Sequence, residues 1–450
     1  MNRTWLWPLW QAVVLSLAVG FTRRGQQRFV QWVTGLALNV EEHTVTQSVV
    51  ALGRVEDWRA LESFAEYGSW DPPALQRGIA VRLGRLPNRA WHGYSVFAGD
   101  DTKVHRTSKD VWGTCTFHEY TARCPNRAST VRAHNWVVLG ALVPNAGQPA
   151  HFLPVASRLY CRKAQLPAAQ NGPPVVFRTK CQLLVEMAQE HAKACGGKTL
   201  GVFDGGYALR SVVRPLVRPD RPDRPRIDFL TRLRHDAALF ALPAPRRPGQ
   251  RGRAAVWGRR LAPPRQGGRW PGAWRDGQAL VYGRVRRVRY KEVICLWRVL
   301  GHDVKVKAVV AEVEGYRRRF TLVSSALDLS GLQLVELFCA RFRQEDAFRD
   351  LKQRLGWEEC RAWTRLPIER TTQAVLTTLT ALRLLQLELE RRRGDDWWLR
   401  PPWNRHKARP SVLDVGRLLR QHTEQIQQGL ASWLDSEGNT GDRGGRRQAM

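Results

Sequence analysis

Two short apolar runs that each reach an aspartate constrain the fold of this chain more than any other feature. They are YSVFAGD (94–100) and TLGVFDGG (199–206), and each has the length and the residue types of a buried strand. In α/β sheets, functional side chains collect where central strands end. Asp100 and Asp204 are therefore candidate site residues.

The segments around these runs predict the rest of the core. Two further β-type runs precede an amphipathic stretch that closes on paired glycines; the three are HNWVVLGALV (134–143), FLPVASRLYC (152–161) and CQLLVEMAQEHAKACGG (181–197). Strand-like runs return at RIDFLTRLR (226–234), ALVYGRVRRVRYKEVICLWRVL (279–300) and VKVKAVVAEV (304–313). Strands followed by a helix and another strand predict a mixed α/β fold class.

The strongest helical pattern covers residues 331–356, after Ser330 and up to a glycine. At about 100° per residue, four of its side chains fall within an arc of about 60°. They are Phe338, Arg341, Glu345 and Lys352. One carboxylate and two cations therefore share a face, although the i, i+4 spacing of the arginine and the glutamate is also that of an ordinary helical ion pair. Further helices are expected over about 369–393 and from Ser411 to about Leu434.

Two strand-end acids and one helix acid form a candidate metal triad of Asp100, Asp204 and Glu345. Three converging carboxylates repel one another, but they suit two divalent ions roughly 3.5–4 Å apart that bracket an in-line attack on a phosphodiester. Oxygen-only ligands favour Mg²⁺, with Mn²⁺ as a substitute. Asp101 is the rival first acid, but neighbours on a strand point to opposite faces, and we expect Asp100 to face the ions. The eight cysteines include no CxxC pair, so neither a zinc nor a redox site is indicated.

The charge of the chain points to a polyanionic partner. It has 72 Lys and Arg against 40 Asp and Glu, a formal net charge of +32. Residues 210–275 hold 17 Arg, no Lys and four Asp, a local net charge of +13. A GC-rich coding bias explains part of the Arg to Lys ratio but not the excess over acids. Because the basic residues run through the whole chain, nucleic acid fits better than a membrane surface.

The first ninety residues have apolar side chains at helical spacing and predict a small helical domain. The run Trp5–Gly20 superficially resembles a signal peptide, but it is too short to span a bilayer and is interrupted by Pro8 and Gln11. We expect a buried helix there. Two short helices around Gly53 have a spacing compatible with a helix-turn-helix.

Several of these segments match a known family. The helix residues Phe338, Arg341, Glu345 and Lys352 follow the spacing Y-x2-R-x3-E-x6-K, with Phe in place of Tyr. The other matching pieces are DDT (100–102), DGGY (204–207) and RLRHDAALF (232–240). With them the chain resembles the DDE transposases of bacterial insertion sequences, in the cut-and-paste, insertion sequence four-like group with a Tyr-Arg-Glu-Lys signature.

The resemblance implies an architecture. It would be an RNase H-like catalytic core, a mixed sheet with flanking helices, interrupted by a β-rich insertion and preceded by a small helical domain. The expected divisions are an N-terminal DNA-binding domain, the first part of the core, the Arg-rich insertion, the core with its catalytic helix, and a C-terminal helix with a basic tail. Their bounds are 1–90, 91–235, 236–325, 326–395 and 396–450.

The resemblance also implies roles for individual residues. Asp100, Asp204 and Glu345 would bind two Mg²⁺ ions and carry out catalysis, while Arg341 and Lys352 would hold DNA phosphate. Phe338 lacks the hydroxyl with which the family's Tyr helps to position phosphate. Three insertion tryptophans are candidates for stacking on an extruded base, although packing is the commoner role of any one of them. They are Trp257, Trp270 and Trp274.

The implied activity is cutting of transposon ends and joining of these ends to target DNA. The partners would be double-stranded DNA, at the terminal inverted repeats and the target, and a second copy of the chain in the DNA complex. No membrane partner is expected, and the location would be the bacterial cytoplasm, at the nucleoid. Two alternatives remain at this stage, an inactive transposase-derived DNA-binding protein and a stand-alone RNase H-like nuclease.

Overall fold

A single mixed sheet organises the computed structural model, which describes residues 5–87, 89–119, 129–145, 148–170, 173–246, 251–394 and 396–438. Its strands are β1 (Ala90–Trp91), β2 (Tyr94–His105), β3 (Cys115–His118), β4 (Thr130–Asn145), β5 (Gln148–Tyr160), β6 (Thr199–Phe203), β7 (Asp228–Arg232), β8 (Leu239–Phe240), β9 (Arg275–Val281), β10 (Arg284–Trp297), β11 (Lys305–Val313) and β12 (Phe320–Ser324). Along the sheet the order is β3-β4-β2-β6-β7-β12-β11-β10-β8, with β1 beside β2, β5 beside β4 and β9 beside β10.

The centre of the sheet is parallel. β6 runs parallel to both β2 and β7, whereas β4 pairs with β2, and β12 with β7, in the antiparallel sense. Gly99 lies opposite Phe203 in the β2–β6 register, where this pairing ends. Asp204 follows the end of β6, whereas Asp100, expected at a strand end, lies inside β2, which continues to His105. A Cβ on Gly99 would lie 2.2 Å from Leu184 Cδ1, so any larger residue here requires the Leu184 side chain to shift where the strand meets its covering helix.

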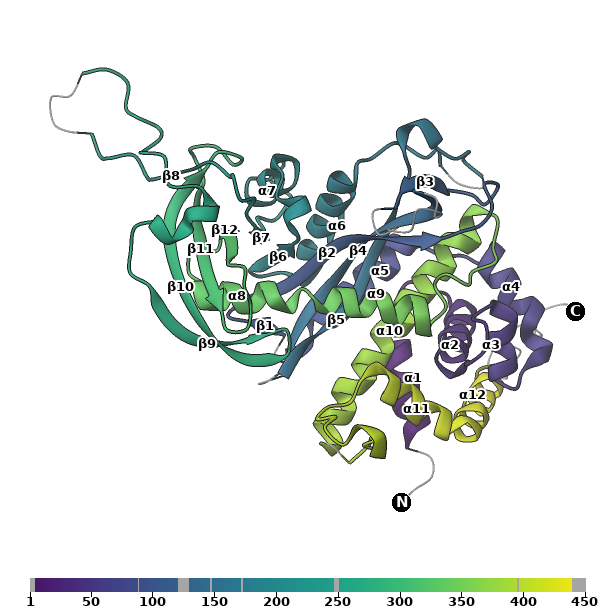
Figure 1. Cartoon of the computed structure of the whole chain (residues 1–450). Helices are drawn as coiled ribbons and strands as arrows, with labels where there is room; N and C mark the ends of the chain where they lie inside the picture. Colours follow the sequence, from purple (N-terminus) through teal and green to yellow (C-terminus); the bar gives the residue numbers. More distant parts are fainter. Residues whose placement is uncertain are drawn as a thin grey trace, which may run out of the picture.

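Helices cover both faces of this sheet and gather beyond one of its ends. They are α1 (Leu6–Leu15), α2 (Arg23–Leu38), α3 (Val45–Ala51), α4 (Trp58–Tyr67), α5 (Pro72–Gly84), α6 (Lys180–Cys195), α7 (Arg210–Val217), α8 (Gly331–Ala340), α9 (Arg343–Arg354), α10 (Arg365–Arg393), α11 (Val412–Gln421) and α12 (Thr423–Gly438). Figure 1 shows α8 and α9 end to end across the sheet, with α6 and α7 on its other side.

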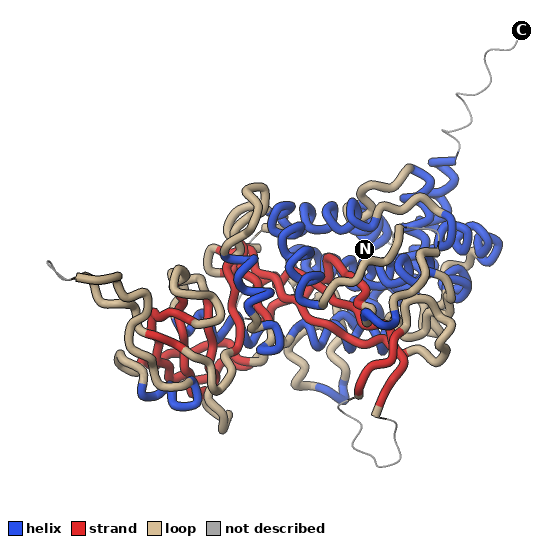
Figure 2. The backbone as a smooth tube through the Cα atoms, turned by 90° about the horizontal axis from the view of Figure 1, so that it is seen from above, coloured by secondary structure: helices blue, strands red, loops and turns tan. Residues whose placement is uncertain are grey.

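The N-terminal and C-terminal helices form one assembly around α10. This helix contacts α1, α2, α4 and α11 as well as strand β5. In Figure 2 the helical assembly lies at one end of the molecule, and the strands of the 236–325 segment lie at the other. The expected buried helix near the N-terminus is α1, in which Trp10 is fully buried and donates from its indole to the Thr34 hydroxyl at 2.9 Å.

The expected single helix over 331–356 is wrong, because the structure has two. Its start is as predicted, with a capping box between Ser330 and Gln333 ahead of α8. Its end is also close, since α9 stops just before Gly356, which has φ +60°. At Arg341 and Phe342, however, the backbone N–H groups bond to carbonyls three residues back, at 3.2 and 3.3 Å. These tighter 3₁₀-type bonds separate α8 from α9.

Other sequence expectations need smaller corrections. The helix expected from Ser411 to about Leu434 is two helices, α11 and α12, separated at His422. Strand β12 was not expected, and it joins the 236–325 strands to the central sheet through β7. None of the helices in the described residues is both long and apolar enough to cross a bilayer.

Candidate active site

The three predicted carboxylates converge on one guanidinium. Arg341 Nη1 lies 3.2 Å from Asp100 Oδ2. The other terminal nitrogen, Nη2, lies 3.1 Å from Glu345 Oε1 and 3.9 Å from Asp204 Oδ1. Two parallel strands and the α8–α9 junction therefore bring together acids that lie far apart in the sequence.

The three acids differ in how far they face solvent. The side chains of Asp204 and Glu345 are 51% and 47% exposed, whereas that of Asp100 is 25% exposed. Burial raises the pKa of Asp100 to about 6, against the lowering effect of Arg341, and the charges of Asp101 and Asp204 add to the rise. One positive charge therefore does not fully compensate this group of acids.

Asp101 points away from this group. Its carboxylate accepts from Lys180 Nζ at 2.6 Å and from the Tyr207 hydroxyl at 2.9 Å. Burial, together with the Asp101 carboxylate, raises the pKa of Tyr207, so this hydroxyl stays a donor. The alternation of side chains along β2 thus directs Asp100 toward α8 and α9, and Asp101 toward α6.

The ring of Phe338 packs against the guanidinium of Arg341. The ring is 7% exposed, and its centroid lies 6.0 Å from the Arg341 guanidinium carbon. This is the geometry of a weak cation–π contact. The position that carries Tyr in the signature therefore packs against Arg341 here.

Lys352 does not join the three acids. Its ammonium donates to the Lys103 carbonyl oxygen and lies 3.6 Å from Glu358 Oε1. Burial lowers the pKa of Lys352. The helix face that the sequence predicted is therefore divided, with Arg341 among the carboxylates and Lys352 held farther along α9.

The three insertion tryptophans lie in different surroundings. Trp270 is 2% exposed and donates from its indole to the Ala262 carbonyl at 2.8 Å, so it presents no face to a base and that expectation is corrected. Trp257 packs against Phe240, with ring centroids 4.8 Å apart. Trp274 is partly exposed and has three cations around its ring, Arg289, Lys291 and Arg319.

The three acids have the ligand chemistry that divalent cations require, but their carboxylates are too far apart in this structure to hold one ion together. All three acids supply carboxylate oxygens, which hard cations prefer. Burial, and to a smaller extent the neighbouring carboxylates, raises the pKa of Asp100, and a bound cation would stabilise its charged form. Within the described part of the chain, however, no three His, Cys, Asp or Glu side chains are close enough to one another to hold a metal ion. The guanidinium of Arg341 separates the carboxylates, so cation binding requires it to release at least one of them.

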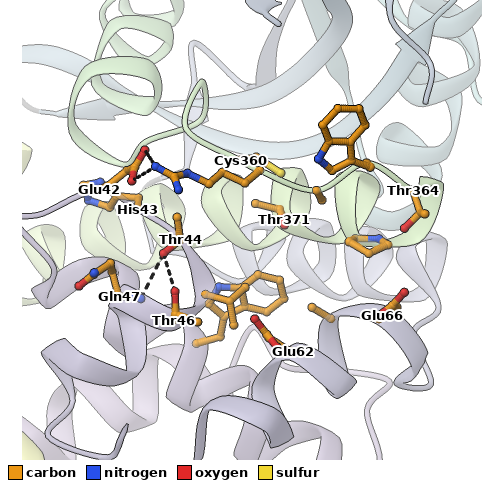
Figure 3. A pocket seen from close by; sticks show the side chains of 17 residues that line it. Glu42, His43, Thr44, Thr46, Gln47, Glu62, Glu66, Cys360, Thr364 and Thr371 are labelled. Atoms are coloured by element: carbon orange, nitrogen blue, oxygen red, sulfur yellow. Dashed lines mark hydrogen bonds and ion pairs between the residues drawn. The ribbon is translucent and has the colours of Figure 1, made fainter. Parts of the chain in front are cut away.

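A cavity of about 550 Å³ lies elsewhere, between α3, α4 and the segment before α10 (Figure 3). In it Arg361 donates to Glu42 at 2.7 Å, and the Thr44 hydroxyl accepts from the Gln47 backbone N–H at the start of α3. None of the three converging acids lines this cavity. It is therefore separate from the carboxylate site.

A comparison with protein families identifies the family of this chain. The model of the DDE superfamily endonuclease family matches residues 16–294, more than half of the chain. The chain belongs to this family of transposase-type nucleases, which generally use divalent metals. Asp100 and Asp204 lie within the matched region, whereas Glu345 lies beyond it. No curated protein matches the chain.

Sequence reasoning missed the residues that hold Asp101. Lys180 begins α6 and Tyr207 follows β6, and neither lies near Asp101 in the sequence. The only signal was the DGGY segment itself, in which the tyrosine comes three residues after Asp204. A polar side chain so close to a strand-end acid is a reasonable candidate for supporting the neighbouring strand.

Proposed function

We propose that this protein is a DNA transposase that cuts transposon ends and joins them to target DNA by two-metal phosphoryl transfer. The observation that carries the proposal is the convergence of Asp100, Asp204 and Glu345 on Arg341 in a chain of this nuclease family. Three carboxylates with so little compensating charge suit a site that works with cations.

In this proposal the three acids are the metal ligands. When bound, Mg²⁺ or Mn²⁺ ions neutralise charge on the phosphodiester and orient its attacking and leaving oxygens. Asp100, the most buried of the three, would bind as its carboxylate, and the more exposed Asp204 and Glu345 would complete the ligand set. Arg341, once released from the carboxylates, has the planar fork that clamps a phosphate in two places. Lys352 would add a point charge if it leaves Glu358.

We also propose membership of the insertion sequence four-like group, which rests on the Y-x2-R-x3-E-x6-K spacing alone. Phe338 cannot donate to phosphate, so its part would be to hold Arg341 in position through the ring contact. The RNase H-like core would then comprise the central strands with α6, α8 and α9. The strands of the 236–325 segment would be the insertion.

Double-stranded DNA is the proposed partner, and two copies of the chain would hold two ends at the nucleoid. The helices on either side of Gly53, α3 and α4, would belong to the end-binding domain. Trp274, which is partly exposed and surrounded by cations, is the strongest of the three tryptophans for base stacking, and Trp257 is second.

The test is a cleavage and joining assay on DNA that carries the element's terminal inverted repeats. Glu345→Gln should abolish Mg²⁺-dependent cutting and leave end binding intact. Glu336→Gln, a carboxylate on α8 that pairs with His92 at 3.0 Å, is the matched control and should cut normally. Undiminished nicking by the Glu345 variant would refute the site. Cutting without any joined product would favour a stand-alone nuclease. DNA binding without cutting would favour an inactive DNA-binding protein.

A further inference from the structure

A cavity of about 300 Å³ lies on the other side of α9. Its walls come from the start of β5, from α9, from the middle of α10 and from the segment that enters α11. Seven of its side chains carry charge, and they are Arg343, Asp346, Arg349, Asp350, Arg354, Arg383 and Arg409. We call this cavity the arginine pocket.

Positive charge exceeds negative charge in the arginine pocket. Asp346 is shared by Arg343 at 2.8 Å and Arg349 at 3.0 Å. Asp350 is shared by Arg354 at 3.8 Å and Arg383 at 3.5 Å. Four guanidinium groups thus share two carboxylates.

Two further residues set the charge of the pocket. Arg409 adds a fifth guanidinium, so the five arginines and two aspartates that line it leave a surplus of three positive charges. Burial lowers the pKa of His151 to about 3, and the charges of Arg383 and Arg343 act in the same direction. The imidazole is therefore neutral, and the surplus comes from arginine alone.

Arg383 has unused donor capacity at this place. Its side chain is 15% exposed, and its Nε is buried without a hydrogen-bond partner. One terminal nitrogen donates to Gln386 Oε1 at 2.9 Å, and the other faces Asp350. Buried donors are normally paired, so a donor without a partner among surplus cations points to an anionic acceptor.

The lining favours a phosphate group over a nucleobase. It contains no tryptophan or tyrosine, and its one phenylalanine, Phe152, is 2% exposed, so no ring is available for stacking. Guanidinium groups bind the oxygens of a phosphate in pairs. A ligand with a single carboxylate would neutralise only one of the three surplus positive charges, and a phosphate offers more anionic oxygens to the guanidinium groups.

We propose that the arginine pocket binds a phosphate of the DNA backbone, at a place distinct from the phosphodiester that is cut. This inference rests on the proposed function, since it takes DNA as the partner. At about 100° per residue, Arg343, Asp350 and Arg354 project roughly 140–180° around α9 from Glu345, whereas Arg349 projects only about 40° from it. The pocket therefore anchors a separate stretch of DNA and positions the duplex without touching the reacting phosphate.

The test compares two double variants of the full chain by fluorescence anisotropy on a labelled duplex. Arg343 and Arg354 are 27% and 42% exposed and project away from Glu345, so Arg343→Gln with Arg354→Gln removes two pocket charges on that side of α9. Arg391→Gln with Arg392→Gln is the control, because these exposed arginines of α10 also pair with a carboxylate, Glu388.

We expect the pocket variant to bind DNA about tenfold more weakly, with the slope of log affinity against log salt reduced by about one. The control should change affinity less than about twofold. Arg409→Gln, on a different segment, should weaken binding in the same direction. Equal affinities and slopes for the pocket variant, the control and the wild type would overturn the DNA assignment.

A second measurement separates the two sources of phosphate. Inorganic phosphate should raise the melting temperature of the wild type more than that of the pocket variant. If it does so while DNA affinity is unchanged, the pocket takes free phosphate and the DNA source is wrong. If neither measurement responds, the pocket is no phosphate site. A wild type that binds no DNA would instead refute the proposed function, and the phosphate measurement would still decide the pocket.

Discussion

The two sides of α9 carry opposite excesses of charge. On one side three carboxylates converge on the single guanidinium of Arg341. On the other side five arginines line a pocket with two aspartates. On the first side one arginine is shared by three acids, and on the second side two aspartates are shared by arginines. Neither cluster is therefore electrically neutral.

In the proposed DNA complex, α9 would therefore contribute to a cation site on one side and to a phosphate site on the other. Unequal ion pairing costs stability in the free protein, because like charges remain close together in partly buried surroundings. A cation on one side and a phosphate on the other would remove these costs. We therefore interpret the imbalance as a mark of binding. The predictions that follow vary the carboxylate side, since the DNA-binding test above already varies the arginine pocket.

The largest effect is expected at the carboxylate side. Asp100→Asn should lower the rate of Mg²⁺-dependent DNA cutting by at least about 10³-fold, roughly 4 kcal/mol of barrier. Asp101→Asn removes the carboxylate of the adjacent residue, whose side chain faces Lys180 and Tyr207. It should lower the cutting rate by less than about tenfold. Gel quantification of cut duplex measures both rates, and the reverse ranking would move the first acid to Asp101.

The second prediction concerns the two proposed roles of Arg341, as counter-ion of the carboxylates and as phosphate clamp. Arg341→Gln frees three carboxylates from their counter-ion, so Mn²⁺ should bind the DNA-free variant about tenfold more tightly than the wild type. Cutting should nevertheless fall by roughly 10²-fold, because the phosphate clamp is lost. Calorimetric titration with Mn²⁺ measures the first change. Weaker Mn²⁺ binding by the variant would show that the guanidinium does not compete with the ion.

The third effect is the pH dependence of metal binding. The pKa of Asp100 is about 6, so a proton competes with the cation below that pH. Mn²⁺ affinity should be nearly constant above pH 7 and fall by up to about tenfold per pH unit below pH 6. Asp100→Asn should remove this dependence along with most of the affinity. A wild-type midpoint near pH 4 would contradict the buried position of Asp100.

The smallest effect concerns stability without metal. Because the folded pKa of Asp100 lies above its ordinary value of 3.8, the folded state binds the proton more tightly, and this group's contribution to stability falls as pH rises from about 4 to 6. At pH 7 Asp100→Asn should therefore raise the free energy of unfolding by about 1–2 kcal/mol. Urea denaturation checks this, and a destabilised variant would mean that the Arg341 contact outweighs burial.

The sequence predicted the parts of the site that depend on local pattern. Asp204 directly follows β6, as its apolar run predicts, and the start of α8 follows from Ser330. The expectation that Asp100 ends its strand is wrong, because β2 continues to His105; Asp100 lies where the pairing of β2 with β6 stops. Strand alternation predicts that Asp100 and Asp101 point to opposite faces, although it does not say which of the two faces the site.

Other features depend on contacts between distant segments, which no local pattern reports. The break at Arg341 and Phe342 contains neither glycine nor proline, so propensity favours an unbroken helix. The burial of Trp270 depends on how the 236–325 segment folds back on β11. The arginine pocket joins residues as far apart as His151 and Arg409.

The most direct test of the central claim is calorimetric titration of Mn²⁺ into the DNA-free protein at pH 7.5. We expect Asp100→Asn, Asp204→Asn and Glu345→Gln each to weaken binding at least about tenfold, because each removes one carboxylate ligand. Asp101→Asn should bind like the wild type. Wild-type affinity in the Glu345 variant, or loss of binding only in the Asp101 variant, would contradict a metal site made of Asp100, Asp204 and Glu345.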